Sequence, residues 1–170
     1  RIHRHRYSAL AAERRCRGAG PAAAQATQVV IDVVVPALGL GPVHFQRTPT
    51  FRVFFPNAPG YPGATSYHSD IMIGHNPREV NVFVPLVRTE GTRSLLMANL
   101  ADSLQVLREY GYDFGRFGRD TQESASLQER LGRLCQPLLC EVGDVVVFDS
   151  RCIHAGPHNK TPLTRVTFDA

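Results

Sequence analysis

The stretch that decides the fold lies near the end of the chain, at residues 143–157, and reads GDVVVFDSRCIHAGP. Its first half is an apolar, β-branched run that is typical of a buried strand, and its second half reaches a histidine just before the turn residues Gly156 and Pro157. Short runs of this kind recur along the chain between Gly, Pro and Asn residues. The predicted strands are Val29–Val35, Val43–Gln46, Thr50–Phe55, Tyr67–Ile73, Val80–Leu86, Ser94–Ala98, Leu138–Val142, Asp144–Asp149, Arg151–His154 and Thr164–Asp169.

These runs do not alternate regularly with helices. Such an order favours an antiparallel sandwich or jelly roll over a parallel α/β sheet, so we expect an all-β core with a few helices outside it. With 170 residues the chain fits one domain, residues 1–170.

Helical patterns are confined to two places, an N-terminal extension at residues 1–28 and an insertion at residues 101–135. In the extension we expect a helix over Tyr7–Arg17, ended by the glycines that follow. In the insertion we expect a helix capped by Asp102, then a loop over residues 112–118, then a helix over Ser124–Leu134.

Composition excludes several classes of function. Apolar residues make up 43% and charged residues 20% of the chain, as in ordinary globular proteins, and the net charge is only +4. Six of the nineteen basic residues lie within Arg1–Arg17, so no basic face is expected on the folded body and nucleic acid is not expected as a partner. No apolar run is long enough to cross a membrane.

The four cysteines, Cys16, Cys135, Cys140 and Cys152, form no CxxC pair. We expect reduced thiols and a cytoplasmic protein, because a domain of this size needs no disulfide. The Arg- and Ala-rich start of the chain leaves organelle targeting as the alternative.

A metal site is predicted from His68-Ser69-Asp70. On a strand, residues i and i+2 point to the same face, so this imidazole and this carboxylate can converge on one ion. A third ligand must come from another strand, and His154 is the best candidate. Two imidazoles and one carboxylate on one face of an octahedron suit iron(II), because three positions stay open. The alternative is that an isolated His-x-Asp is a surface pair or a satisfied core histidine.

An anion site is predicted from Arg165 and Thr167, which share a strand face by the same rule. An arginine that points into an apolar barrel is costly unless an anion meets it. A dicarboxylate co-substrate would answer that need, with the guanidinium binding the distal carboxylate in a bidentate manner and the hydroxyl adding a hydrogen bond. The alternative is an outward-facing arginine on an edge strand.

In combination, His-x-Asp, a distal His and Arg-x-Thr resemble the pattern of the 2-oxoglutarate/iron(II) oxygenase superfamily. Residues 43–170 look closest to its streptomycin-biosynthesis-type branch, related to the phytanoyl-CoA hydroxylases. The strings that carry this likeness are Gln46-Arg47-Thr48-Pro49-Thr50-Phe51-Arg52-Val53, Tyr67-His68-Ser69-Asp70, His75, Glu79-Val80-Asn81, Pro85-Leu86 and Gly91-Thr92. Where that branch has Asn after Gly-Thr, this chain has Arg93.

The resemblance implies a double-stranded β-helix (a cupin-like jelly roll), with His68, Asp70 and His154 as catalytic iron(II) ligands. It also implies that Arg165, Thr167 and Asn81 bind 2-oxoglutarate, that O2 is consumed, and that ascorbate assists. Because a carboxylate stands at Asp70, no position is left for chloride, and hydroxylation or desaturation of a small molecule is expected rather than halogenation.

Other residues near these motifs have two interpretations. Gln46 and Arg52 either bind an anion at the barrel mouth or are surface residues. His75 and His158 lie beside turn residues, where solvated loop histidines are expected. Residue Asp149 either supports His154 or is a turn residue, and Cys152 shares a strand face with that histidine.

Two further functions stay open. A cupin-type metal-dependent isomerase or epimerase would use the same histidines without 2-oxoglutarate, and a non-catalytic jelly-roll binding module would need no metal. Residues 101–135 and 57–66 are expected to cover the barrel mouth, where loops set specificity. The sequence leaves the substrate and the oligomeric state open.

Overall fold

The computed structural model describes residues 3–6, 21–39, 41–44, 46, 49–57 and 66–169. Its strands form two sheets, and every pairing within these described residues is antiparallel. The larger sheet has the order β1 (His3–Arg6), β6 (Asp144–Asp149), β3 (Val80–Pro85), β8 (Arg165–Asp169), β2 (Thr50–Phe54). The smaller sheet has the order β5 (Gln136–Pro137), β4 (Leu96–Met97), β7 (His154–Ala155).

The two sheets share one core. Phe83 of β3 and Val146 and Phe148 of β6 pack with Met97 of β4 and with Leu138, just after β5. Alternate residues of the same long strands face the other way, as the two-residue period of a strand requires. A second core on that outer face joins strand valines to the first helices, and its buried members are Val29, Val30, Val34, Val82, Val84, Val145 and Val147. The arrangement is a jelly-roll, cupin-like β fold, as predicted.

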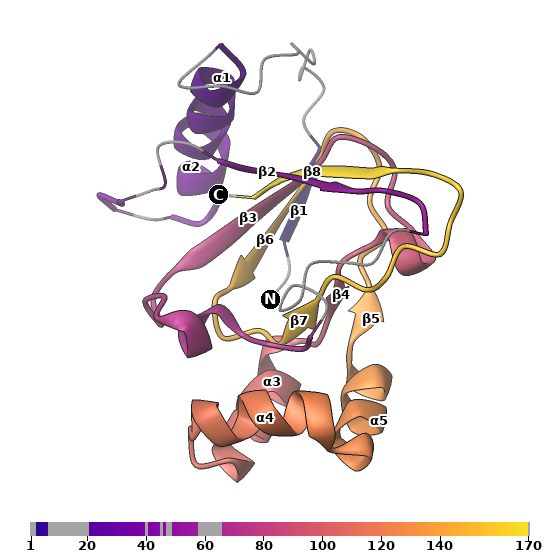
Figure 1. Ribbon diagram of the computed structural model, residues 1–170. Coiled ribbons are helices and arrows are strands. Elements are labelled where there is room, and N and C mark those ends of the chain that lie inside the picture. Colours follow the sequence, from indigo (N-terminus) through magenta and orange to yellow (C-terminus); the bar gives the residue numbers. More distant parts are fainter. Residues whose placement is uncertain are drawn as a thin grey trace.

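Helices lie outside the sheets at both ends of the molecule (Figure 1). At one end are α1 (Pro21–Val29), the π-helical turn η1 (Val30–Val34) and α2 (Val35–Ala37). At the other end are the helices of the insertion, α3 (Leu100–Glu109), α4 (Phe114–Glu123) and α5 (Ala125–Leu134). None of the helices in the described ranges combines the length and the apolar character that a bilayer span demands.

The predicted strand Val29–Val35 is wrong, because this run is helical. Its buried members are Val29, Val30 and Val34, of which the last two are four residues apart, and they pack on the outer face of β3 and β6. The β-branched composition favours a strand, but one helical face packed against a sheet buries the same side chains. The extension is also not wholly helical, since β1 pairs with β6. The predicted helix Tyr7–Arg17 lies outside the described residues.

The prediction that Tyr67–Ile73 is one strand is also wrong. His68 forms a single antiparallel bridge with His154, and the chain then turns into the 3₁₀ helix η2 (Asp70–Ile73). The turn ends at Gly74, whose φ of 97° lies in the left-handed region that favours glycine. The two metal-site residues on this segment are therefore brought together by a tight turn and not by the pleat of a strand.

Smaller corrections concern strand ends. The predicted strand Ser94–Ala98 is confirmed only at β4, and β7 begins at His154, where the predicted strand ends. The predicted strand Leu138–Val142 is displaced, because the residues that pair as a strand are those of β5, just before it. Within 138–142, Cys140 forms a single bridge to Thr89. Residues 43, 44 and 46 belong to no strand. The other three long strands, β2, β3 and β8, are confirmed within one residue, and β6 has the predicted bounds.

The insertion is helical as predicted, with different boundaries. Asn99 caps α3 by accepting a hydrogen bond from the backbone N–H of Asp102, so Asp102 lies in the first turn and is not the cap. The predicted loop ends early, since Asp113 caps α4. Ser124 caps α5, whose Leu127 and Leu131 are buried as expected.

Besides η2, the described residues contain one further 3₁₀ turn, η3 (Gly91–Arg93), which precedes Ser94. The backbone carbonyl of Ser94 accepts a hydrogen bond from Arg165, the first residue of β8.

Candidate metal centre and its cavity

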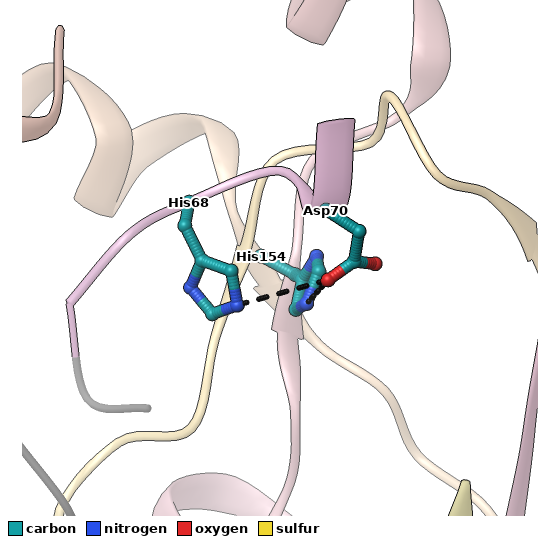
Figure 2. Close-up of side chains that lie close together, drawn as sticks. All are labelled: His68, Asp70 and His154. Carbon is teal, nitrogen blue, oxygen red and sulfur yellow. Dashed lines mark ion pairs between the residues drawn. The ribbon is translucent and has the colours of Figure 1, made fainter. Parts of the chain in front are cut away.

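Three side chains converge where the two sheets meet. His68 and His154 are held opposite each other by a pair of backbone hydrogen bonds, 3.0 and 2.8 Å long. Asp70 is held by its own N–H, which donates to the carbonyl of Ser150 at 2.9 Å. The side chains point toward one another (Figure 2). Their ligand atoms all lie within 4.8 Å of one another.

This group could bind a metal ion. The Asp70 Oδ1 atom is 3.7 Å from His154 Nε2 and 4.0 Å from His68 Nε2. Ligands about 2.1 Å from a metal and at right angles are roughly 3.0 Å apart. The donors thus need to close by about 1 Å, which small side-chain rotations can supply. Two imidazoles and one carboxylate on one side of a six-coordinate metal ion would leave three positions open.

Both imidazoles are oriented for ligation. The Nδ1 atom of His68 lies 2.8 Å from the carbonyl oxygen of Ser66, and that of His154 lies 3.0 Å from the carbonyl oxygen of Cys152. A carbonyl can only accept, so each Nδ1 carries a proton, and in the neutral form of each ring it is the Nε2 lone pair that faces Asp70. Burial and, to a lesser extent, the neighbouring His68 together lower the pKa of His154 to about 4, against the opposing effect of Asp70. At neutral pH His154 is therefore in the form that binds a metal.

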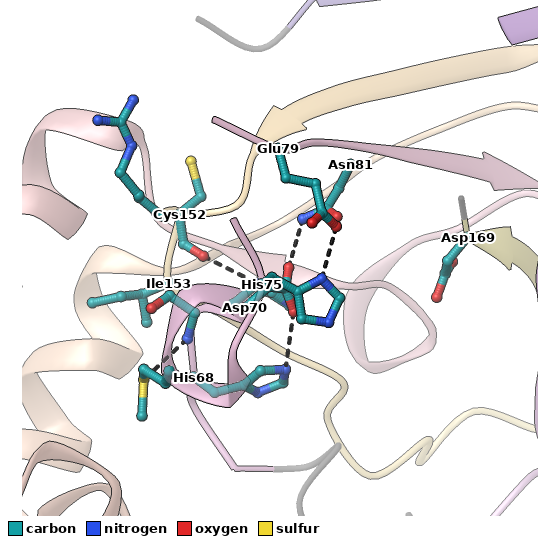
Figure 3. Close-up of polar contacts among 12 residues, drawn as sticks. His68, Asp70, His75, Glu79, Asn81, Cys152, Ile153 and Asp169 are labelled. Carbon is teal, nitrogen blue, oxygen red and sulfur yellow. Dashed lines mark hydrogen bonds and ion pairs between the residues drawn. The ribbon is translucent and has the colours of Figure 1, made fainter. Parts of the chain in front are cut away.

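Asp70 is fixed by a residue of the larger sheet. The Nδ2 atom of Asn81 donates to Asp70 Oδ2 at 2.5 Å, which leaves Oδ1 facing the histidines (Figure 3). The sequence expectation placed Asn81 in the site as a co-substrate contact. It does face the site from β3, but its amide nitrogen is used by the carboxylate, and contact with a co-substrate stays a prediction.

A cavity of about 570 Å³ opens beside the three side chains. This volume lies in the range of small-molecule sites. Most of its lining residues come from three parts of the fold. The larger sheet contributes Thr50, Arg52, Phe54, Asn81, Val82, Phe83, Phe148, Arg165 and Asp169; the η2 region contributes Tyr67, Met72, Ile73, His75 and Glu79; and α4 contributes Gly118, Thr121 and Gln122. The insertion therefore reaches the cavity. Of the segment 57–66 only Asn57 and Ser66 lie within the described residues, and Ser66 lines the cavity.

Arg165 lies in the wall of this cavity and is almost fully buried, with 2% of its surface exposed. Its Nη1 donates to the Ser94 carbonyl at 2.8 Å, and its guanidinium carbon lies 3.7 Å from the centre of the Phe54 ring. The Nε atom is buried with no hydrogen-bond partner among the described residues. Burial lowers the pKa of Arg165 to about 10, against the opposing effect of Asp169, so the side chain is a cation at neutral pH.

Thr167 shares the inward face of β8, as predicted, and is fully buried. It is not among the described residues that line the cavity, so a hydrogen bond from it to a co-substrate stays a prediction. The sequence interpretation missed the next residue on that face, Asp169, which does line the cavity and pairs with Arg52. The signal was present, because the two-residue period that links Arg165 to Thr167 also reaches Asp169.

A second missed pair stands near the cavity mouth. His75 Nδ1 lies 2.7 Å from Glu79 Oε1, and both residues line the cavity (Figure 3). The hydrogen bond to Glu79 raises the pKa of His75. His75 is thus more than a solvated loop histidine, although 43% of its side chain is exposed.

The remaining candidates lie outside the cavity wall. Asp149 is paired with Arg151, as expected of a turn residue. Cys152 points its thiol into the core between the sheets, and only its backbone carbonyl contacts His154. His158 is exposed.

Comparison with known proteins finds a distant relative. The streptomycin biosynthesis protein StrG of Streptomyces griseus is 29% identical to this chain over 128 residues. These cover 75% of this chain and 45% of StrG, so the chain spans less than half the length of that relative. This likeness agrees with the streptomycin-biosynthesis part of the resemblance found in the sequence motifs, and membership of the 2-oxoglutarate/iron(II) oxygenase superfamily stays a prediction.

No protein-family profile matches the chain. Among solved structures, the crystal structure of EvdMO1 aligns with a TM-score of 0.41 and 18% identity, over 86% of this chain and 43% of that one. At that level of similarity the fold rests on the strand pairing described above and not on the alignment.

Proposed function

We propose that this protein is an iron(II)- and 2-oxoglutarate-dependent dioxygenase that hydroxylates or desaturates a small organic molecule, with release of succinate and carbon dioxide. One observation carries the proposal. A two-histidine, one-carboxylate group and a buried, cationic Arg165 line the same cavity. The group suits a metal that needs open positions, and the arginine suits an acid that binds at that metal with one end and carries a carboxylate at the other.

Bound iron(II) would supply the oxygen-dependent redox chemistry that couples decarboxylation of 2-oxoglutarate to oxidation of a C–H bond. The chain itself would hold the metal through His68, His154 and Asp70. Asn81 keeps the carboxylate turned toward the histidines.

The far carboxylate of the co-substrate is assigned to Arg165, whose guanidinium is rigidly placed. Stacking on Phe54 and the hydrogen bond to the Ser94 carbonyl leave it little freedom, so binding an anion costs little further ordering. The apolar rings of Phe83 and Phe148 line the same wall and keep water from the reacting groups.

The substrate side of the cavity is assigned to α4, with Gly118, Thr121 and Gln122. These side chains are small or polar. Together with the likeness to a streptomycin biosynthesis protein, they support a small, polar, natural-product-like substrate. We treat residues 1–170 as a single oxygenase domain that acts in the cytoplasm.

The test is succinate formation from 2-oxoglutarate with iron(II), ascorbate and oxygen, measured with and without each component. Succinate that depends on both iron and oxygen, and that increases when a substrate is added, is the expected result. A protein that binds iron and 2-oxoglutarate in the cavity but never forms succinate would contradict the proposal.

A second candidate is a cupin-type metal-dependent isomerase or epimerase. The His75–Glu79 pair favours it, because an imidazole fixed at Nδ1 and lining the cavity can exchange a proton at Nε2. His75→Gln separates the two functions. For an oxygenase, it should leave iron-dependent succinate formation within about twofold of wild type. A wild type that forms no succinate, together with complete loss of substrate isomerisation in His75→Gln, would favour the isomerase.

A further inference from the structure

The charges at the Arg165 end of the cavity are set by three residues on two neighbouring strands. Arg165, Thr167 and Asp169 face inward from β8, and the register places Arg52 of β2 opposite Thr167. Arg52 is therefore diagonal to both Arg165 and Asp169, at the separation where long side chains still meet. All three charged residues line the cavity.

Asp169 pairs with Arg52 and not with Arg165 in the structure. Its carboxylate forms an ion pair and hydrogen bond with Arg52 Nε. Among the described residues it makes no such contact with Arg165, which instead uses the Ser94 carbonyl. The arginines differ in burial, since 45% of the Arg52 side chain is exposed and Arg165 is almost fully buried.

The balance of charge follows from this pairing. Burial raises the pKa of Asp169, while Arg52 and Arg165 act to lower it, so the carboxylate depends on its cationic neighbours. With Arg52 in place, Asp169 is neutralised and one positive charge, that of Arg165, is left for a ligand. Without Arg52, Arg165 would be the remaining cation beside the Asp169 carboxylate, and its positive charge would be offset before an incoming acid arrives.

We propose that Arg52 is a positioning residue that neutralises Asp169, so that Arg165 stays available to the carboxylate of an acidic ligand. The ligand class is a carboxylic acid, and in the proposed function, on which this inference rests, it is 2-oxoglutarate. Asp169 thereby sets how strongly the site selects for an anion, although it does not itself touch the ligand carboxylate.

The experiment is a double-mutant cycle read by calorimetric binding. Wild type, Arg52→Gln, Asp169→Asn and the double variant are loaded with nickel(II) without oxygen and titrated with 2-oxoglutarate. In parallel, the metal-free proteins are titrated with glutarate, a five-carbon diacid without the 2-oxo group. Arg52→Lys keeps a cation beside Asp169, and Arg88→Gln removes an exposed arginine that lies outside the cavity wall.

Arg52→Gln should weaken binding of both acids by about tenfold or more, the size expected for a new unit charge near the site. Asp169→Asn should restore the affinity of Arg52→Gln to within about threefold of wild type. Arg52→Lys and Arg88→Gln should bind like wild type. Thermal unfolding of each variant checks that the fold is intact, and a misfolded double variant is replaced by Arg52→Gln with Asp169→Ser.

Each other outcome decides the matter. If Arg52→Gln binds as tightly as wild type, the inference fails and the proposed function stands. If Arg52→Gln is weak and Asp169→Asn does not restore it, Arg52 contacts the ligand directly and the inference is overturned. If the wild type binds glutarate but not 2-oxoglutarate, and glutarate follows the cycle, the inference stands and the proposed function fails. If the wild type binds neither acid, both fall.

Discussion

Protonation of His154 should control how the stability of the metal-free protein depends on pH. Burial, with His68 nearby, lowers the pKa of this imidazole from 6.5 to about 4. Between these two values the unfolded chain binds a proton that the folded protein does not, so the free energy of unfolding falls as the pH falls from 6.5 to 4. At about 1.4 kcal/mol per pH unit, the full effect is roughly 3 kcal/mol.

The perturbation is His154→Asn, which removes the titrating ring. Urea unfolding of the metal-free wild type and of the variant is followed between pH 7 and pH 4. Carboxylates titrate in both proteins, so the informative quantity is the difference between the two free energies of unfolding at each pH. That difference should shrink by roughly 3 kcal/mol on going from pH 7 to pH 4. His158→Gln, at an exposed position, serves as the control and should run parallel to wild type.

Metal gives the same experiment a second arm. A divalent metal at 100 times its dissociation constant should raise the free energy of unfolding at pH 7 by about 2.7 kcal/mol in wild type and not in His154→Asn. Parallel pH profiles for wild type and His154→Asn would refute the reasoning, because they would mean that the buried imidazole does not resist protonation.

Four further predictions follow from single residues. Asp70→Ala should abolish metal binding by calorimetry while the circular dichroism melt of the metal-free protein stays near that of wild type; global unfolding would mean that the carboxylate is structural. Arg165→Lys keeps the charge but loses the planar fork, so it should weaken 2-oxoglutarate binding by about 1–3 kcal/mol. The concentration of 2-oxoglutarate that half-saturates succinate formation should rise accordingly, with metal affinity unchanged. Burial raises the pKa of Cys135 to about 12 and that of Cys152 to about 11, so a thiol reagent at pH 8 should label them only after unfolding; rapid labelling of the folded protein would contradict this burial. Leu131→Ala, at a fully buried position of α5, should cost about 2–5 kcal/mol in urea unfolding, and a cost near zero would mean that the insertion is not packed.

Part of the fold was readable from the sequence because its long strands carry their own pattern. β6 has the predicted bounds, because a β-branched run between turn residues favours a strand. The helix pattern of Ser124–Leu134 was equally plain, because Leu127, Leu131 and Leu134 share one helical face. Where the pattern was only apolar, as in Val29–Val35, the prediction failed. The side chains of a run of valines can be buried either by a strand or by one face of a helix. In this fold a helix face packs on the outer face of the larger sheet.

The sequence by itself also determined which residue types meet, namely two histidines, a carboxylate and an arginine with strand-like spacing. Only the tertiary structure decided how they meet. His68 and Asp70 are neighbours through a 3₁₀ turn and not through a strand, because the backbone of Asp70 is held by Ser150, eighty residues away in sequence. Long-range hydrogen bonds of this kind leave no local trace in the sequence.

Which charged residues pair with one another was likewise determined by the tertiary structure. An inward-facing arginine at position 165 implies an anion, but the same strand also carries Asp169, and nothing in the spacing says which cation that carboxylate will join. The register between β2 and β8 settles it by placing Arg52 beside Asp169 while Arg165 is held by Ser94 and Phe54. Strand spacing is a property of one segment, whereas charge pairing depends on which segments the fold brings side by side.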